Sequence, residues 1–486
     1  MNVLTIFLLI RERSVEDKMF FPPIKQKIHS HIYYKMDKNP IRKDVLKIAW
    51  PVLLELLLSS LFGMIDMMML GRIKDPMEAA ASVAAIGLTN QPLFIGLSLV
   101  QALNIGATAM VGRYLGTHEY EKMETTVKHV LLLNVLFVGI PWSIITIRFA
   151  KSIMIFMGAE WDALQYGLPY FKIIMVGFIF QSISFALSAA LRGVGETKAP
   201  MKVNITVNLF NVIGNAILIY GLFGLPALGV KGAALSTAGS HVLSAFALVF
   251  YVMKGKSVIP FHFKKPFRFD RNILLNFIKI GVPASLEQLV LRVGLIIFAK
   301  IVASLGTVIF AAHQIGLNIL GLSFQPGSAF GISASALLSR SLGEEEPEKA
   351  EAYAKETRRI GSLISTIMAI VFFLFSKQLV GLYTNDPEII KNASTVLKII
   401  AFVQPFQSSQ LILAGGLRGA GDTVWPLVAT LLSLLCIRTS LAYLFVKVLH
   451  YGLLGAWIAI FVDQFVRWII IYLRFLSGKW KDIKIH

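Results

Sequence analysis

The chain has 486 residues, of which 56% are hydrophobic and only 15% charged, and its mean hydropathy is +0.68. An ordinary soluble domain carries about a quarter charged residues, so this balance excludes a water-soluble enzyme, a disordered chain and a coiled coil. One membrane-spanning helix with its loop takes roughly 20 to 30 residues, which leaves room for about twelve spans and no large soluble domain. The composition therefore predicts an integral membrane protein that is not an enzyme.

The formal net charge of +19 arises from 47 basic and 28 acidic residues. In a membrane protein, an excess of basic residues first indicates which loops face the cytoplasm. Placing both termini and every second loop on one side gathers about 31 of the 47 basic residues there, against about 8 on the other side. We therefore expect a multi-pass protein of the plasma (inner) membrane with both termini in the cytoplasm and with no nucleic-acid partner. The single cysteine, Cys436, excludes a disulfide framework and thiolate metal sites.

Apolar stretches long enough to cross about 30 Å of hydrocarbon recur along almost the whole chain. Their length, and polar residues spaced three and four apart, favour helices over the alternating ten-residue segments of a barrel. We expect an all-α fold with twelve spans, near residues 45–71, 84–110, 127–148, 166–190, 200–222, 230–253, 274–302, 308–337, 360–380, 393–416, 424–447 and 452–474. The apolar run within the first residues is too short to span, so residues 1–40 are expected to form a basic cytoplasmic extension.

The two halves of the chain resemble each other. GRYLG at residues 112–116 matches SRSLG at 339–343 with a shift of 227 residues, and LRGVGET at 191–197 matches LRGAGDT at 417–423 with a shift of 226. Six spans have therefore been duplicated. Because six is an even number, both copies insert in the same direction and are related by an axis along the membrane normal.

This duplication predicts two pseudo-symmetric lobes of six helices each, with a substrate path between them. The N-lobe is expected at residues 41–253 and the C-lobe at 274–476. A basic cytoplasmic linker at 254–273 joins the lobes, and a cytoplasmic tail follows at 477–486.

In their order, spacing and duplication, these motifs resemble the MATE (multidrug and toxic compound extrusion) transporter family of the multidrug/oligosaccharidyl-lipid/polysaccharide flippase superfamily. The similarity covers about residues 43–475 and includes PVLLELLLSSLFGMIDMMMLG at 51–71, GVPASLEQ at 281–288 and AAHQIG at 311–316. The resemblance implies a V-shaped arrangement of two six-helix lobes. It also implies export of organic, often cationic, compounds coupled to inward flow of protons or sodium ions.

Cation coupling needs an acidic side chain at membrane depth, and such groups are expensive in hydrocarbon. Asp66 is the clearest candidate, since it lies in a methionine-rich run with no further charge before Arg72. The resemblance also places the cation-coupling aspartate of the first helix at this position. A carboxyl held there can exchange a proton, whereas neighbouring oxygens could instead hold Na⁺. The alternative is a carboxylate near the outer interface that is simply solvated or paired.

Glu55 and Glu287 occupy equivalent positions in the two copies, each four residues after a helix-bending proline. Proline frees a carbonyl one turn back, and a carboxyl beside it can form a cation site. For Glu287 the alternative is an ion pair with Arg292 or with a neighbouring helix. Some MATE members have a tenth-helix aspartate where this chain has Gln407. The resemblance therefore makes a sodium site at Glu287 and Gln407 less expected, and it favours proton coupling through Asp66.

Polar residues on apolar spans are the candidates for the cavity and for substrate binding. Four asparagines recur at intervals of four, three and four residues, which places them on one face of the fifth span: Asn204, Asn208, Asn211 and Asn215. The stripe either lines a cavity or joins helices by hydrogen bonds, and the end at Asn211 and Asn215 is expected to be functional. The remaining candidates are Gln181, Gln404, Gln407, Gln314 and Asn318.

We therefore expect a secondary active multidrug efflux antiporter that exports organic, cationic compounds in exchange for H⁺, or alternatively Na⁺, by alternating access. A Walker-type nucleotide loop is missing from the sequence, and no cofactor is expected. The expected partners are small organic substrates and membrane lipids, with the protein as a monomer. The alternative is a lipid-linked oligosaccharide or lipid flippase of the same superfamily, whose cavity should be lined by arginine and lysine instead of carboxylates and amides.

Overall fold

The structure, a computed structural model, describes residues 38–73, 76–262 and 267–485. These residues form helices and turns with no strand among them. Eleven of the described helices are long and apolar enough to cross a membrane. The extension expected at residues 1–40 lies, apart from its last three residues, outside the described part of the chain.

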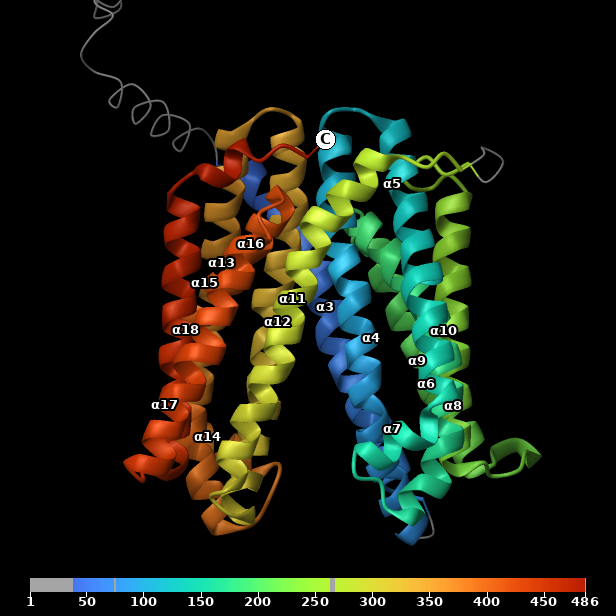
Figure 1. Ribbon diagram of the computed structural model, residues 1–486, viewed down its shortest axis with the longest axis vertical. Helices are drawn as coiled ribbons and strands as arrows, with labels where there is room; N and C mark the ends of the chain where they lie inside the picture. The colour runs from blue at the N-terminus through green and yellow to red at the C-terminus, as the bar shows by residue number, and fades with distance from the viewer. Residues whose placement is uncertain (1–37, 74–75, 263–266, 486) are drawn as a thin grey trace, which may run out of the picture.

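The first half of the chain forms one bundle, coloured blue to green in Figure 1. Its third span runs on without a break through a π-helical segment, and a short helix, α7 (Ala150–Phe156), follows it. The spans are α3 (Lys38–Leu70), α4 (Pro76–Gly116), α5 (Tyr120–Leu132) with η1 (Leu133–Gly139) and α6 (Ile140–Arg148), α8 (Trp161–Gly193), α9 (Lys198–Tyr220) and α10 (Gly229–Met253).

The second half forms the bundle coloured yellow to red. Its fifth span again contains π-helical segments, and a short helix, α14 (Ser376–Gly381), follows its third span. The spans are α11 (Arg271–Ala303), α12 (Thr307–Gly343), α13 (Pro347–Leu374), α15 (Pro387–Ala420), α16 (Val424–Thr430) with η3 (Leu431–Arg438), α17 (Thr439–Tyr443) and η4 (Leu444–Val448), and α18 (Gly452–Leu476).

Helix α11 is the predicted span that is missing from the eleven apolar ones. It has the same length as α3, but charged side chains at Lys279, Glu287, Arg292 and Lys300 interrupt its apolar sequence. Figure 1 shows α11 running along the whole length of its lobe, where it packs against α16 and η3. The fold is therefore the predicted all-α membrane architecture with twelve spans.

The two lobes meet at the end of the molecule that carries the C-terminus and diverge towards the other end, as Figure 1 shows. We call these the closed end and the open end. At the closed end the two copies of the repeated motif pack against each other. A Cβ atom on Gly116 would collide with the Arg340 carbonyl, and one on Gly343 would collide with the Arg113 carbonyl. The repeated glycines are therefore required because backbone meets backbone between the lobes.

The C-terminal tail also crosses the closed end. Trp480 is completely buried in the C-lobe core and donates to the Phe475 carbonyl at 2.9 Å. Further along, Arg113 of the N-lobe donates to the Ile483 carbonyl at 2.8 Å, and Ile485 packs against the N-lobe core. The tail therefore connects both lobes in this conformation.

Gly343→Ala is expected to loosen the closed end. The added methyl group meets backbone atoms of Arg113 and Gly116 that cannot rotate aside, and overpacking of this kind destabilises by about 1 to 3 kcal/mol. Spin labels at Thr117 and Glu345, which are exposed beside this contact, should give longer and broader distances than in the unsubstituted protein.

The matched control is Gly321→Ala in the same helix, because a Cβ at Gly321 meets nothing within 4 Å. That variant should keep the original distance distribution. An unchanged distribution in Gly343→Ala would show that the glycine contact does not hold the lobes together.

Candidate functional site

Helices α3 and α9 run side by side in the same direction. Asn204 donates a hydrogen bond to Glu55, and Asn215 donates one to Asp66 at 2.8 Å. Both pairs are separated by 149 residues along the sequence, so the register between the two helices is constant over three turns. The asparagine stripe of α9 therefore faces α3, and both of its ends contact a carboxylate of that helix.

The end of the stripe at Asn211 and Asn215 is closed on its other side by α10. The hydroxyl of Ser236 on α10 donates a hydrogen bond to the backbone carbonyl of Asn211 at 2.9 Å. The Asn211 amide matches its neighbours when its nitrogen faces Asp66, at 3.2 and 3.0 Å from the two carboxylate oxygens. Its oxygen then accepts from the backbone N–H and the hydroxyl of Thr237, each at 3.2 Å. Two amides of α9 thus hold the Asp66 carboxylate, and α10 orients one of them through Thr237.

Neutral groups alone surround this carboxylate. No lysine or arginine of the described residues lies within ion-pair distance of Asp66, and its partners are the amides of Asn211 and Asn215. The side-chain oxygen of Asn215 is buried and has no hydrogen-bond partner. A charged carboxyl without a counter-ion, next to an unused acceptor, is unusual at membrane depth and identifies the Asp66 cluster (Asp66, Asn211, Asn215 and Thr237) as the candidate site.

The cluster lies on the open side of a contact between the lobes. Gln325 of α12 donates to Ser60 of α3 at 3.0 Å, and Asp66 is about 9 Å further along α3 towards the open end. Beyond this contact the facing surfaces are exposed on both helices. The exposed residues are Met64, Met67 and Met68 on α3 and Gln314 and Asn318 on α12. These side chains are exposed on facing surfaces of the two lobes near the depth of Asp66, and we call the region between them the cleft.

Glu55 and Glu287 occupy matching ion pairs in the two lobes. Glu55 contacts Arg192 at 2.6 Å, and Glu287 contacts Arg418 at 2.6 Å, with each glutamate side chain only 4% exposed. The arginines belong to the repeated motifs LRGVGET and LRGAGDT. A third polar residue contacts the same carboxylate oxygen in each site, Asn204 in the N-lobe and Thr430 in the C-lobe, while the second oxygen of each glutamate is buried without a hydrogen-bond partner among the described residues. The shift of 226 residues relates these third partners as well.

The other polar candidates do not join the Asp66 cluster by any described hydrogen bond. Gln404 and Gln407 are buried within the C-lobe, and neither amide has a hydrogen-bond partner. Gln181 is half-buried with its oxygen unpaired, and Asn208 donates back to the Asn204 carbonyl within α9. Among the described residues, no group of three or more histidine, cysteine, aspartate or glutamate side chains could hold a metal ion.

Sequence reasoning missed four of the residues in these sites, namely Arg192, Arg418, Thr430 and Thr237. Arg192 and Arg418 were visible as the arginines of the repeated motifs LRGVGET and LRGAGDT, and the repeat that relates Glu55 to Glu287 was the signal that could have paired each glutamate with its arginine. Thr237 gave no such signal, because a threonine on the small-residue sequence of α10 is unremarkable until Asn211 is seen against it.

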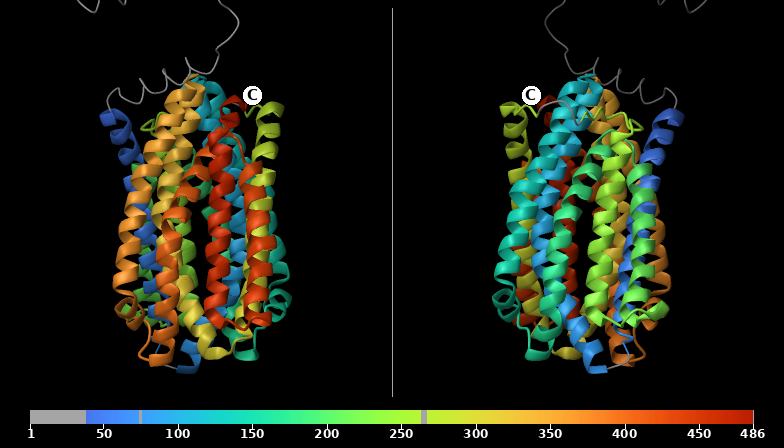
Figure 2. Two further views of the ribbon diagram at one scale, coloured as in Figure 1. Left: turned by 90° about the vertical axis from the view of Figure 1, so that its left-hand side faces the viewer. Right: turned by 90° about the vertical axis from the view of Figure 1, so that its right-hand side faces the viewer.

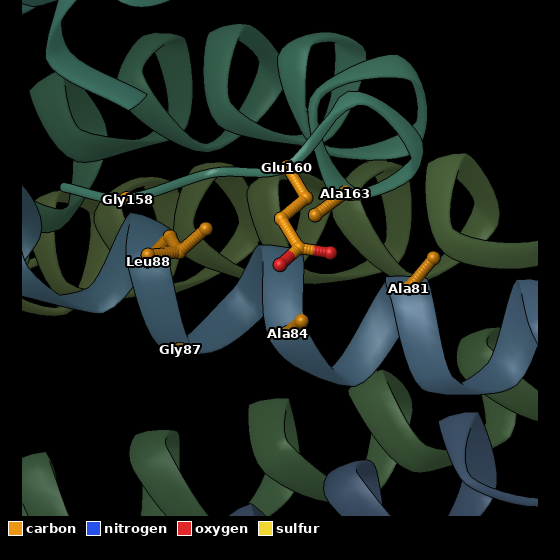
Figure 3. A pocket seen from close by; sticks show the side chains of 7 residues that line it. All are labelled: Ala81, Ala84, Gly87, Leu88, Gly158, Glu160 and Ala163. Atoms are coloured by element: carbon orange, nitrogen blue, oxygen red, sulfur yellow. The ribbon is translucent and has the colours of Figure 1, made fainter. Parts of the chain in front are cut away.

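A pocket of about 520 Å³ lies in the N-lobe between α4 and the segment preceding α8. Figure 3 shows the Glu160 side chain reaching across α4 towards Ala84, with Ala81 and Leu88 on either side. None of its lining residues belongs to the Asp66 cluster. Its wall of alanine and glycine with one exposed carboxylate offers no convergent polar groups, so it is not the candidate site.

Comparison with known families gives a match to the MatE family over residues 51–217 and 283–444, one segment in each lobe. The two segments begin at Pro51 and Pro283, the prolines that the internal repeat relates.

Two curated proteins are similar over most of their length. The "Probable multidrug resistance protein NorM" of Thermotoga maritima is 30% identical over 450 residues, which cover 92% of this chain and 95% of the relative. The "Multidrug resistance protein NorM" of Vibrio cholerae is 28% identical over 404 residues, which cover 81% and 83%.

Solved structures show the same fold. A MATE-family multidrug resistance transporter described in an outward-facing conformation superposes with a TM-score of 0.83 at 21% identity, covering 90% of this chain and 97% of the other. A transporter of the same superfamily from Pyrococcus furiosus gives a TM-score of 0.83 at 22% identity with the same coverage. The V-shaped pair of six-helix lobes is therefore shared with these proteins.

Proposed function

The chain belongs to the MATE family of multi-pass membrane transporters, and on this premise we propose that it exports organic cations in exchange for protons that bind Asp66. Membership makes the protein a transporter and not an enzyme. The NorM relatives are named for multidrug resistance, which supports small organic compounds as the substrates. The observation that carries the coupling proposal is the Asp66 carboxylate, held by neutral amides at the edge of the cleft.

A proton suits the Asp66 cluster better than Na⁺. Both asparagines turn amide nitrogens towards the carboxylate, and N–H groups stabilise a negative charge but repel a cation. A sodium site would need several oxygens directed at one point. Protonation requires less, since the amide of Asn215 can reverse and offer its unpaired oxygen to a protonated Asp66. Asparagine therefore serves both protonation states of the carboxyl.

The transport cycle follows from a competition between proton and substrate for this carboxylate. In the conformation with the open end accessible, a proton entering from outside neutralises Asp66 and removes the attraction that holds a cationic substrate. The substrate then leaves into the external solution. After the lobes reorient, the proton dissociates into the cytoplasm, and the restored charge captures the next substrate. The only chemical change in the cycle is the charge at one carboxyl. The proton gradient supplies the free energy, and the different affinities of the two states couple it to export.

The exposed cleft residues support a polyspecific exporter. Methionine side chains are flexible and polarisable, and they pack against ligands of different shapes; three of them are exposed on α3. The cleft residues opposite them are amides. Neither group contains lysine or arginine, and Arg292 of α11 stacks over the ring of Phe94 of α4. The pyrophosphate of a lipid-linked oligosaccharide would require several basic residues, so the multidrug exporter is favoured over the flippase.

We place the closed end in the cytoplasm. The excess of lysine and arginine in the loops and tail at this end is the basis for this orientation, and it makes the present conformation outward-facing. The protein is proposed to act as a monomer in the plasma membrane, since one chain supplies both lobes and the cleft between them.

The test is export of a fluorescent cationic dye from proteoliposomes with a pH gradient and a sodium gradient imposed separately. The proposal predicts export with the pH gradient alone and no additional export with the sodium gradient. Export that requires the sodium gradient would show that Na⁺, and not the proton, is the coupling ion. No dye movement under either gradient would contradict multidrug export.

A further inference from the structure

The membrane-facing surface of the C-lobe contains a pocket that the transport cycle does not use. It has a volume of about 520 Å³ and lies between α13, α15 and α18, on the face of the C-lobe shown in the left view of Figure 2. Its lining combines three basic residues with two serines and two aromatic rings: Lys355, Arg358, Arg359, Ser362, Pro405, Phe406, Ser409 and Trp468. We call it the basic pocket.

The positive charge of the basic pocket is only partly neutralised. Lys355 pairs with Glu351 at 2.5 Å, and Arg359 lies 3.9 Å from Glu356. Arg358 has no carboxylate within ion-pair distance among the described residues. Its guanidinium instead stacks at 5.0 Å over the ring of Tyr472. An excess of positive charge therefore remains on this surface and is available to an anion.

The aromatic wall of the pocket is preorganised. Trp468 stacks on Tyr472 with ring centroids 5.3 Å apart and donates to the Ser409 hydroxyl at 3.0 Å. Because that hydroxyl accepts from the indole, its own hydrogen is left to donate. The Tyr472 ring also holds Arg358 in place. The anion site is thus formed before a ligand arrives, which reduces the entropy lost on binding.

The position of the pocket along α13 matches the boundary between headgroups and acyl chains. Leu363, Ile367 and Ile370 are 60%, 55% and 55% exposed, and their spacing of four and three residues makes one lipid-facing stripe. Arg359 lies on the same stripe, one turn closer to the closed end. Tryptophan, here Trp468, is also characteristic of the membrane interface. A phosphate at the arginines would place its acyl chains along the apolar stripe.

The N-lobe provides an internal comparison. The shift of 227 residues aligns Lys355 with Lys128, but it aligns Arg358 and Arg359 with Leu131 and Leu132. The equivalent surface of the N-lobe is therefore apolar where the C-lobe carries two guanidinium groups. Packing of the repeated fold does not require these arginines, which leaves their charge to be explained by a ligand.

We propose that the basic pocket binds the phosphate group of an anionic glycerophospholipid from the closed-end leaflet. Arg358 and Arg359 contact the phosphate oxygens, the Ser409 hydroxyl donates to one of them, and the acyl chains lie along Leu363 and Ile367. This inference does not depend on the transported substrate or on the coupling ion, and its test measures lipid binding without transport.

The experiment is native mass spectrometry of the full-length detergent-solubilised protein with equimolar phosphatidylglycerol and phosphatidylcholine. The unsubstituted protein should bind phosphatidylglycerol preferentially. Arg358→Leu/Arg359→Leu gives the C-lobe the residues of the N-lobe. It should lower the affinity for the first bound phosphatidylglycerol about 30-fold, because the attraction of two basic residues to an anionic lipid together amounts to about that factor. Its binding of phosphatidylcholine should not change.

The matched control is Arg268→Leu/Arg271→Leu, which removes two exposed arginines beside the start of α11. This control should keep the phosphatidylglycerol preference, because it changes the net charge equally without touching the pocket. An equal loss of phosphatidylglycerol affinity in both double variants would show that the affinity depends only on the net charge of the protein, and it would overturn the proposal. Displacement of the lipid by inorganic phosphate alone would show a soluble-anion site instead. Unchanged elution of Arg358→Leu/Arg359→Leu on size exclusion confirms that the variant is folded.

Discussion

Asp66→Asn is expected to reduce proton-driven dye export to the level of empty liposomes. The substitution preserves the size of the side chain and its position beside Asn211 and Asn215, so the fold should be retained. It removes the only charge change in the cluster, and without different affinities in two states a gradient cannot drive transport. The measurement is dye export from proteoliposomes with an imposed pH gradient.

Asp386→Asn is the matched control for this change. Asp386 caps the start of α15 at the open end through the backbone N–H groups of Glu388 and Ile389, and asparagine caps a helix equally well. Export should therefore be unaffected by this substitution. Full proton-driven export by Asp66→Asn would place the coupling group elsewhere in the chain.

The second large effect is expected for the buried ion pair of the C-lobe. Arg418→Leu leaves Glu287 buried without its partner, and breaking a buried pair in this way destabilises by about 3 to 5 kcal/mol. Glu287→Leu/Arg418→Leu removes both charges and should recover most of that loss. Thermal unfolding in detergent measures both variants. Arg340→Leu is the control, because its pair with Glu344 is exposed and should contribute at most about 1 kcal/mol.

The same double variant decides what Glu287 does. We propose that Glu287 and Glu55 join helices within their lobes and do not exchange the coupling ion, because an arginine already neutralises each carboxylate and, with a further polar group, binds one of its oxygens. Retained proton-driven export by Glu287→Leu/Arg418→Leu would agree with this role. Loss of export from a double variant of normal thermal stability would make Glu287 part of the coupling mechanism.

The number and type of the elements could be predicted because hydrocarbon imposes a minimum length on each apolar run. The ends of the helices could not. Helix α13 begins at Pro347, well before the predicted span at residue 360, because its first turns are polar and extend beyond the apolar layer. The internal repeat was equally readable, since GRYLG and SRSLG recur at a fixed spacing. That these motifs would meet at Gly116 and Gly343 required the structure.

The candidate site was only partly readable from the sequence. Helical periodicity placed Asn211 and Asn215 on one face, but periodicity does not say which helix that face contacts. The register between α3 and α9, which sets Asn215 against Asp66, depends on packing over the whole N-lobe. The ion pairs of Glu55 and Glu287 raise the same difficulty, because their arginines lie far away in sequence.

Proton release on drug binding is the most direct test of the proposed competition at Asp66. Purified protein in weakly buffered detergent solution is mixed with a cationic drug, and a pH indicator records the protons released per bound drug. The account predicts proton release by the unsubstituted protein at a pH where Asp66 is partly protonated, and none by Asp66→Asn. Drug binding that releases no protons at any pH, or equal release by both proteins, would contradict it.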